Sequence, residues 1–152
     1  MKQILLIEDE AHKKEEITGY LKEFLGSDLI LSEADSVREA VMAVTENNYD
    51  LIVLDMALPT FTASCESISG GLDQALGGVE VLRSLKALGK ELNVVIVTQY
   101  PDISLGGKRI KLKAAKTTLE KKYGQKVRGT VLYKYKSSLN RSKIKTIVDS
   151  IW

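Results

Sequence analysis

The chain has 152 residues, of which 44% are hydrophobic and 28% are charged, which is enough for one domain built around a single core. No apolar run approaches the roughly 20 residues that cross a membrane, and the opening MKQILLIEDE is not a signal peptide. The single cysteine, Cys65, excludes an internal disulfide and leads us to expect a cytoplasmic protein.

Charge is distributed unevenly along the chain, although the net charge is only +2. Residues 1–105 hold 8 Lys and Arg against 18 Asp and Glu, whereas residues 106–152 hold 14 against 2. This asymmetry predicts an acidic surface and a basic surface. The basic surface suits an acidic protein or nucleic acid, and the alternative is a face that water alone covers.

Five short apolar runs predict strands, and helical patterns lie between them. The runs are Ile4–Ile7, Leu29–Leu31, Leu51–Leu54, Val94–Val97 and Thr130–Tyr133. Nearly continuous apolar runs are typical of parallel strands that are covered on both faces. The helices are predicted around Ile17–Phe24, after a Ser36–Glu39 capping box, around Val79–Leu85, over Leu112–Tyr123 and around Ile144–Ile151.

Strand and helix alternate five times, which predicts a doubly wound α/β fold with a five-stranded parallel sheet. We expect residues 1–152 to form one domain. Two connections, at about 59–77 and 100–111, are longer than the two to six residues that are usual in such folds. Long connections of this kind tend to carry function.

Polar side chains follow four of the predicted strands at the same edge of the sheet. Glu8 and Asp9 end the first strand, Asp55 the third, Thr98 the fourth and Lys134 the fifth. Ligands bind at this edge in doubly wound sheets. Three clustered carboxylates require a cation, for which Mg2+ is suited, and an aspartate beside such an ion can attack phosphorus.

The chain resembles the receiver domains of two-component response regulators. The matching segments are ILLIEDE, LIVLDMALP, GGVEVLRSL, VVIVT and VLYK. The resemblance implies a flavodoxin-like fold of the CheY type, with strand order 2-1-3-4-5. It also implies a phosphoryl group donated by a histidine kinase or phosphotransfer protein, and no enzymatic activity beyond self-phosphorylation and autodephosphorylation.

The resemblance also implies a role for each site residue. These are Asp55 as phosphoryl acceptor; Glu8, Asp9, Asp55 and the backbone carbonyl of Ala57 as Mg2+ ligands; and Thr98 and Lys134 as contacts of the phosphoryl group.

Several positions depart from the family pattern. Tyr135 follows Lys134 where a proline is usual, so Lys136 is an alternative for the lysine role. Gln99 stands where a small residue is usual, and we expect it to crowd the phosphoryl site. Val131 replaces the usual switch aromatic, for which Tyr100 and Tyr133 are alternatives.

Three functions are compatible with these features. The first is a stand-alone receiver that signals through protein contacts, because the chain ends at Trp152 after the fifth helix. The second is a pseudo-receiver that binds partners without phosphorylation. The third is a Mg2+-dependent phosphohydrolase, against which Ala57 counts because haloacid-dehalogenase enzymes carry an acid at that position.

We expect the output contact to involve the basic C-terminal part of the chain. It carries Lys113, Lys116, Lys121 and Lys122 on the fourth helix and Arg141, Lys143 and Lys145 on the fifth. An acidic protein surface is the first choice of partner. Nucleic acid is the second, because no DNA-reading motif is present.

Overall fold

The computed structural model describes residues 1–58, 77–105 and 108–152. The predicted 59–77 connection, which contains Cys65, lies outside these residues except for Gly77. The elements in chain order are β1 Lys2–Ile7, α1 Ala11–Leu25, the 3-10 turn η1 Gly26–Asp28, β2 Leu29–Ala34, α2 Val37–Glu46, β3 Leu51–Leu54, α4 Gly77–Ala87, β4 Asn93–Thr98, β5 Asp102–Leu105, β6 Lys108–Lys111, α5 Leu112–Tyr123, β7 Lys126–Leu132 and α6 Ser138–Ile151.

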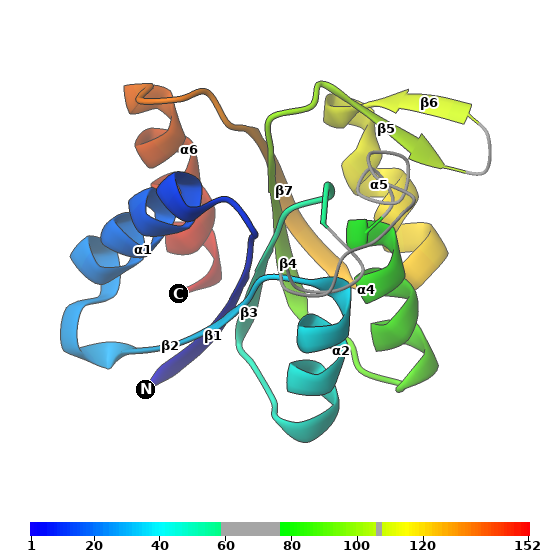
Figure 1. Cartoon of the computed structure of the whole chain (residues 1–152), viewed down its shortest axis with the longest axis horizontal. Helices are drawn as coiled ribbons and strands as arrows, with labels where there is room; N and C mark the ends of the chain where they lie inside the picture. Colours follow the sequence, from blue (N-terminus) through cyan, green and yellow to red (C-terminus); the bar gives the residue numbers. More distant parts are fainter. Residues whose placement is uncertain (59–76, 106–107) are drawn as a thin grey trace.

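The main sheet has the predicted topology. All its strand pairs are parallel, in the order β2-β1-β3-β4-β7. The helices cover both faces: α1 and α6 lie on one side, and α2, α4 and α5 on the other (Figure 1). Two hydrophobic clusters fill the two spaces between the sheet and the helices, so alternate residues of the central strands face opposite layers.

Local sequence signals set the ends of the helices. The Ser36 hydroxyl accepts a hydrogen bond from the Glu39 N–H at 3.1 Å, while the Glu39 carboxylate accepts one from the Asp35 N–H at 3.0 Å. This arrangement confirms the predicted cap of α2. Helix α5 ends at Gly124, whose φ of 66° is the left-handed conformation that glycine adopts without strain.

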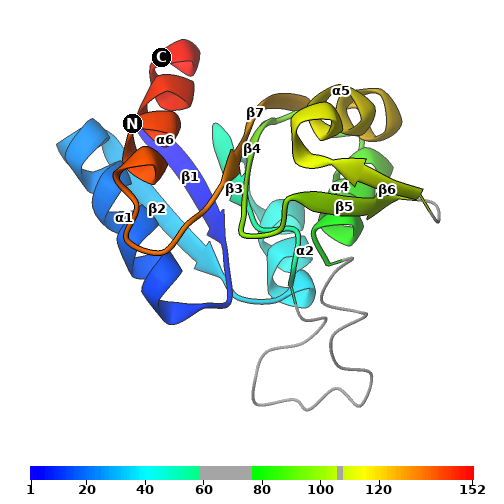
Figure 2. The ribbon, with the colours of Figure 1, turned by 90° about the horizontal axis from the view of Figure 1, so that it is seen from above.

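The 100–111 connection differs from the predicted loop because it contains a β-hairpin. Strands β5 and β6 pair in antiparallel fashion, from Asp102 opposite Lys111 to Leu105 opposite Lys108. Ile103 and Leu105 are buried in the same cluster as α4 and α5. The Leu112 N–H donates to the Pro101 carbonyl at 2.8 Å, which closes the base of the hairpin. The hairpin extends beyond the carboxyl edge of the main sheet, beside α5 (Figure 2).

Candidate acidic site at the carboxyl edge of the sheet

Two carboxylates are positioned by backbone bonds that continue the sheet. The Glu8 N–H donates to the Ala34 carbonyl at 3.0 Å, and the Asp55 N–H donates to the Ile7 carbonyl at 3.1 Å. Both side chains are therefore fixed at neighbouring strand ends. Asp9 follows Glu8, and oxygen atoms of all three residues lie within 4.8 Å of one another. The predicted acidic group is thus brought together.

The three acids differ in their exposure and their partners. Glu8 is 1% exposed and Asp55 is 4% exposed, whereas Asp9 is exposed at the rim. Glu8 Oε2 accepts hydrogen bonds from the N–H groups of Asp9 and Glu10, each at 3.1 Å. Asp55 Oδ1 accepts one from the Ala57 N–H at 3.2 Å. Asp9 does not cap α1, because Glu10 holds the N-cap position.

Burial raises the pKa of each of the three acids. Desolvation, followed by the nearby charge of Asp55, raises the pKa of Glu8 to about 8. Desolvation also raises the pKa of Asp55, against the opposing effects of Lys13, the Ala57 N–H and the Thr98 hydroxyl. The pKa of Asp9 is raised in the same way, by partial burial and by Asp55. Strongly perturbed carboxyls that face one another are typical of functional sites.

A buried lysine that was not among the predicted site residues lies between the two strand-end carboxylates. Lys13 Nζ is 2.7 Å from Glu8 Oε1 and 3.5 Å from Asp55 Oδ1, and it donates to the Val97 carbonyl at 3.0 Å. The side chain is 0% exposed. A signal for it was present in the sequence, because Lys13 continues the buried stripe of Ile17 and Leu21 on α1. A lysine at a core position of a helix requires a buried partner.

Lys134 lies outside this group of charges. Its side chain is exposed, and among the residues that the structure describes it makes no ion pair. Asn140 binds its backbone on both sides: Oδ1 accepts from the Lys134 N–H at 3.0 Å, and Nδ2 donates to the Lys134 carbonyl at 2.6 Å. Lys136 is also exposed, with its Nζ 5.3 Å from the centre of the Tyr135 ring. Among the described residues neither lysine forms an ion pair with the three acids, and the phosphoryl contact expected of one of them stays a prediction.

The other predicted residues lie around the acids. Thr98 is fully buried at the end of β4, and its hydroxyl accepts a long hydrogen bond, 3.4 Å, from the Tyr100 N–H. Gln99 reaches across the site, where its Nε2 donates to Glu10 Oε1 at 3.0 Å. Tyr133 is buried and donates to Glu16, whereas Tyr100 is 50% exposed. Of the two alternative aromatics, Tyr133 is therefore the one packed into the site.

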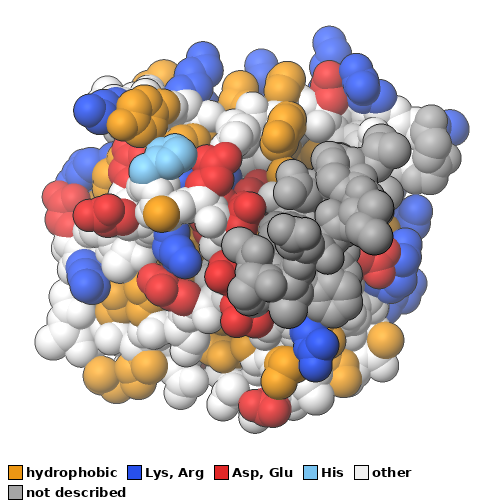
Figure 3. Space-filling model, viewed as in Figure 1, with side chains coloured by type: hydrophobic (Ala, Val, Ile, Leu, Met, Phe, Trp, Pro, Cys, Tyr) orange, Lys and Arg blue, Asp and Glu red, His pale blue; other side chains and the backbone are white. Residues whose placement is uncertain are grey.

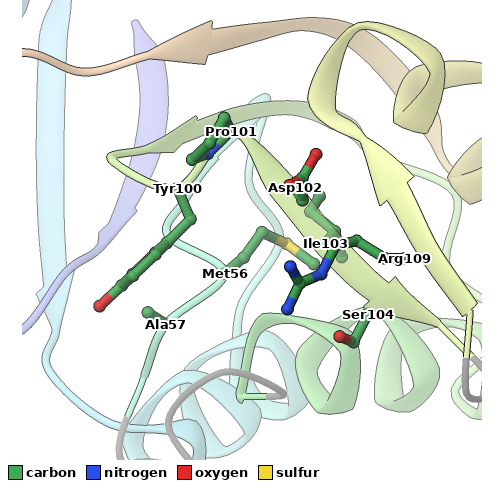
Figure 4. A pocket seen from close by; sticks show the side chains of 8 residues that line it. All are labelled: Met56, Ala57, Tyr100, Pro101, Asp102, Ile103, Ser104 and Arg109. Carbon is green, nitrogen blue, oxygen red and sulfur yellow. The ribbon is translucent and has the colours of Figure 1, made fainter.

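A cavity of about 320 Å³ adjoins the site beneath the hairpin. Figure 4 shows the Tyr100 ring extending toward Ala57 and the Arg109 guanidinium turned toward Met56. The hairpin therefore forms one wall of this cavity, and Met56 and Ala57, which directly follow Asp55, form another part of its lining. Figure 3 shows acidic side chains gathered near the middle of this face, beside the histidine, with lysine and arginine mostly around its edge.

The basic residues of the C-terminal part do not form the single face that was predicted. Lys111, Lys113 and Lys143 line one cavity of about 520 Å³ between α5, β7 and α6. Arg141 instead faces α1, where its Nη2 is 2.6 Å from Glu23 Oε1. Lys145 pairs with Asp149 at 2.9 Å. An electrostatic contact with an acidic partner therefore stays a prediction, now centred on the three lysines of the cavity.

Comparison with known proteins identifies the family. Its model, described as the response regulator receiver domain, matches residues 4–127. This range includes the three acids and Thr98 and ends before Lys134. The chain is 31% identical over 122 residues to the Detocs response regulatory protein DtcB of Vibrio alginolyticus, and the match covers 80% of this chain and 81% of that protein.

Solved structures share the fold at low identity. Response regulator protein TrrA of Thermotoga maritima, in complex with Mg(2+)-BeF, matches with a TM-score of 0.59 and 19% identity, over 97% of this chain and 99% of that one. A chain of the CheX-CheY-BeF3-Mg+2 complex from Borrelia burgdorferi matches with a TM-score of 0.66 and 17% identity, over 99% and 88%. Within the described parts of the chain, no helix has the length and apolar character that crossing a membrane requires. The sheet order, the acidic group and the family match agree, and the chain belongs to the response regulator receiver domain family.

Proposed function

We propose that the chain is a receiver that accepts a phosphoryl group on Asp55 from a histidine kinase or phosphotransfer protein. The observation that carries this proposal is the acidic group, in which a nearly buried Asp55 faces Glu8 and Asp9 within 4.8 Å. Buried Thr98 ends the neighbouring strand and offers a hydroxyl on the same edge. This combination supplies a nucleophile and groups that can hold the transferred phosphoryl.

The donor set fits a hard divalent cation. Its members are carboxylate oxygens, with a backbone carbonyl at Ala57 as a further candidate, and Mg2+ prefers such ligands. Glu8, Asp9, Asp55 and the Ala57 carbonyl would hold Mg2+, which when bound supplies positive charge to the phosphoryl oxygens. The structures of TrrA and of the CheX–CheY complex contain Mg2+ with a beryllium fluoride, and we propose the same metal for this chain.

The transfer itself requires little from the protein beyond positioning. One carboxylate oxygen of Asp55 attacks phosphorus, and a new O–P bond forms. The bond from phosphorus to the donor nitrogen of a phosphohistidine breaks, and the imidazole leaves with the bonding electron pair. The backbone N–H of Ala57, 3.2 Å from Asp55 Oδ1, keeps the carboxylate in a fixed orientation. We expect Thr98 to donate its hydroxyl hydrogen to the arriving group.

Acetyl phosphate tests the proposal without knowledge of the kinase. Wild-type protein incubated with acetyl phosphate and Mg2+ should gain the mass of one phosphoryl group, as measured by intact-mass spectrometry. Asp55→Asn should gain none, and wild type in EDTA should gain far less. Equal labelling of Asp55→Asn would remove Asp55 from this role. A wild-type chain that is never labelled would favour a pseudo-receiver that binds its partners without phosphorylation.

A further inference from the structure

Lys13 is held inside the acidic site by α1. The side chain is 0% exposed, although a lysine is almost never fully buried without a partner. Its ammonium group has three N–H donors. One is used by Glu8 Oε1 at 2.7 Å and one by the Val97 carbonyl at 3.0 Å. The ring of Tyr133 closes another side, with its centre 5.4 Å from Nζ.

The third N–H donor of Lys13 is the one that could bind a group on Asp55. Asp55 Oδ1 lies 3.5 Å from Nζ, which is within ion-pair reach but longer than a good hydrogen bond. A phosphoryl group on Asp55 adds negative charge and strong acceptor oxygens beside this donor. The ammonium therefore already lies next to the atom that reacts, and it has donor capacity that short contacts do not use.

No other lysine is in a comparable place within residues 1–58, 77–105 and 108–152. Lys13 is the lysine that pairs with Asp55 there, and Lys134 is exposed with its backbone fixed by Asn140. Electrostatics favours the lysine that is already desolvated and paired.

We propose that Lys13, and not Lys134, is the lysine that binds the phosphoryl group on Asp55. This inference rests on the proposed function. Before phosphorylation Lys13 contacts Glu8 and Asp55, and so it competes with a divalent cation for the same oxygens. After phosphorylation it pairs with a phosphoryl oxygen. Because Lys13 stands on α1, the phosphorylation state of Asp55 is then read directly by that helix.

The two roles predict opposite effects of one substitution. In Lys13→Met, Mg2+ alone should bind at least as tightly as in wild type, because the competing ammonium is gone. Labelling by acetyl phosphate should fall by about tenfold or more, because a cation at the transferring group is lost. Lys13→Arg should recover part of the labelling, and Lys134→Met, the matched control, should label within about twofold of wild type. A lysine with a merely structural role would weaken Mg2+ binding and labelling together.

A measurement on the wild-type fold covers the case in which Lys13→Met does not fold. A buried ammonium is protected from solvent and gives a lysine 15Nζ NMR signal, which the exposed Lys134 should not. Addition of beryllofluoride with Mg2+, a phosphoryl analogue, should shift the Lys13 signal. An unshifted Lys13 signal with a newly protected Lys134 would overturn the inference. So would wild-type labelling in Lys13→Met together with its loss in Lys134→Met. Failure of wild type itself to be labelled would instead count against the proposed function.

Discussion

Asn140 shows how a single side chain can hold a backbone segment beside the site. It is 1% exposed, and its amide binds both the N–H and the carbonyl of Lys134, at 3.0 and 2.6 Å. These two bonds anchor the segment between β7 and α6, at the position where family members usually carry a proline. The Lys134 side chain, beside this anchor, is exposed.

Replacing Asn140 by Ala should destabilise the fold. The change leaves the Lys134 N–H and carbonyl without these partners, so we expect the free energy of unfolding to fall by about 1–3 kcal/mol. Urea unfolding measures this. Ser142→Ala on the same helix is the control, because Ser142 is exposed and makes only a weak bond of 3.4 Å to the Ser138 carbonyl; it should change stability by less than about 0.5 kcal/mol. Equal losses in both variants would contradict the anchoring role.

At the residue scale, the sequence indicated where the acids lie more fully than it indicated which lysine lies beside them. Glu8, Asp9, Asp55 and Thr98 stand at strand ends, and a parallel sheet necessarily brings its strand ends to one edge. Lys134 also follows a strand, but its side chain is exposed, and no periodicity reveals the contact with Asn140 that holds its backbone. In the sequence, Lys13 is notable only as a charged residue in line with the apolar residues of α1. Its partners could be identified only from the structure, which packs α1 against the end of β4.

Helix α4 begins in contact with the end of β3, and this contact helps to position Asp55. A Cβ atom added to Gly78 would lie 2.7 Å from Met56 Cα and 2.8 Å from the Asp55 carbonyl oxygen. The Gly78 N–H donates to the Met56 carbonyl at 3.0 Å. The absence of a side chain therefore allows the helix to approach the backbone that carries the acceptor.

Gly78→Ala should consequently both displace Asp55 and lower the free energy of unfolding. We expect a loss of about 1–3 kcal/mol from overpacking, and slower labelling by acetyl phosphate in the folded protein. The control is Gly19→Ala on α1, where a Cβ meets nothing within 4 Å; this change should stabilise the chain by up to about 1 kcal/mol. Thermal melts and labelling rates check both variants. Unchanged labelling in folded Gly78→Ala would show that the contact does not position Asp55.

At the element scale, the sheet and its covering helices were predictable, and the hairpin was missed. Continuous apolar runs marked the central strands, and caps at Ser36 and Gly124 marked helix ends. Strands β5 and β6 have only four residues each and are mostly polar. Gly106-Gly107 between them in the sequence is a hairpin signal that was available. Only one face of the hairpin is buried, at Ile103 and Leu105. Two alternating apolar residues are too few to distinguish a strand from a loop in the sequence.

The whole molecule carries a cluster of buried acids that opposes folding when no metal is bound. Burial and Asp55 raise the pKa of Glu8 to about 8 from an ordinary value of 4.5, although Lys13 acts in the opposite direction. The folded state therefore retains a proton that the unfolded chain has already released. Because the unfolded state binds fewer protons in this range, the free energy of unfolding falls as pH rises from about 4.5 to about 8.

Outside this site, Glu23 and Glu39 do not produce this slope, whereas Asp35 does, because its hydrogen bond with Glu39 and its burial raise its pKa. The pKa of Glu23 is lowered by its hydrogen bond to Arg141, and that of Glu39 by its contacts with Asp35. Each of these two carboxylates contributes its full stability at any pH above its pKa in the unfolded chain. That contribution is lost only as pH falls through the lowered pKa of the folded state. Asp9 and Asp55 are shifted upward and add to the effect of Glu8. The expected decline with pH thus originates mainly in the acidic site, where the shift of the Glu8 pKa is large, and Asp35 acts in the same direction.

Thermal melts in EDTA should therefore show a midpoint that decreases between about pH 5.5 and about pH 8.5. Millimolar Mg2+ should raise the midpoint, and by more at the higher pH, because a metal binds the ionised carboxylates and only the folded chain presents them together. Glu8→Gln, which has no proton to lose, should flatten the decline in EDTA and reduce the gain from Mg2+. A wild-type midpoint that rises with pH in EDTA, or a Glu8→Gln variant with the same slope as wild type, would show that the acidic site does not control the stability of this receiver.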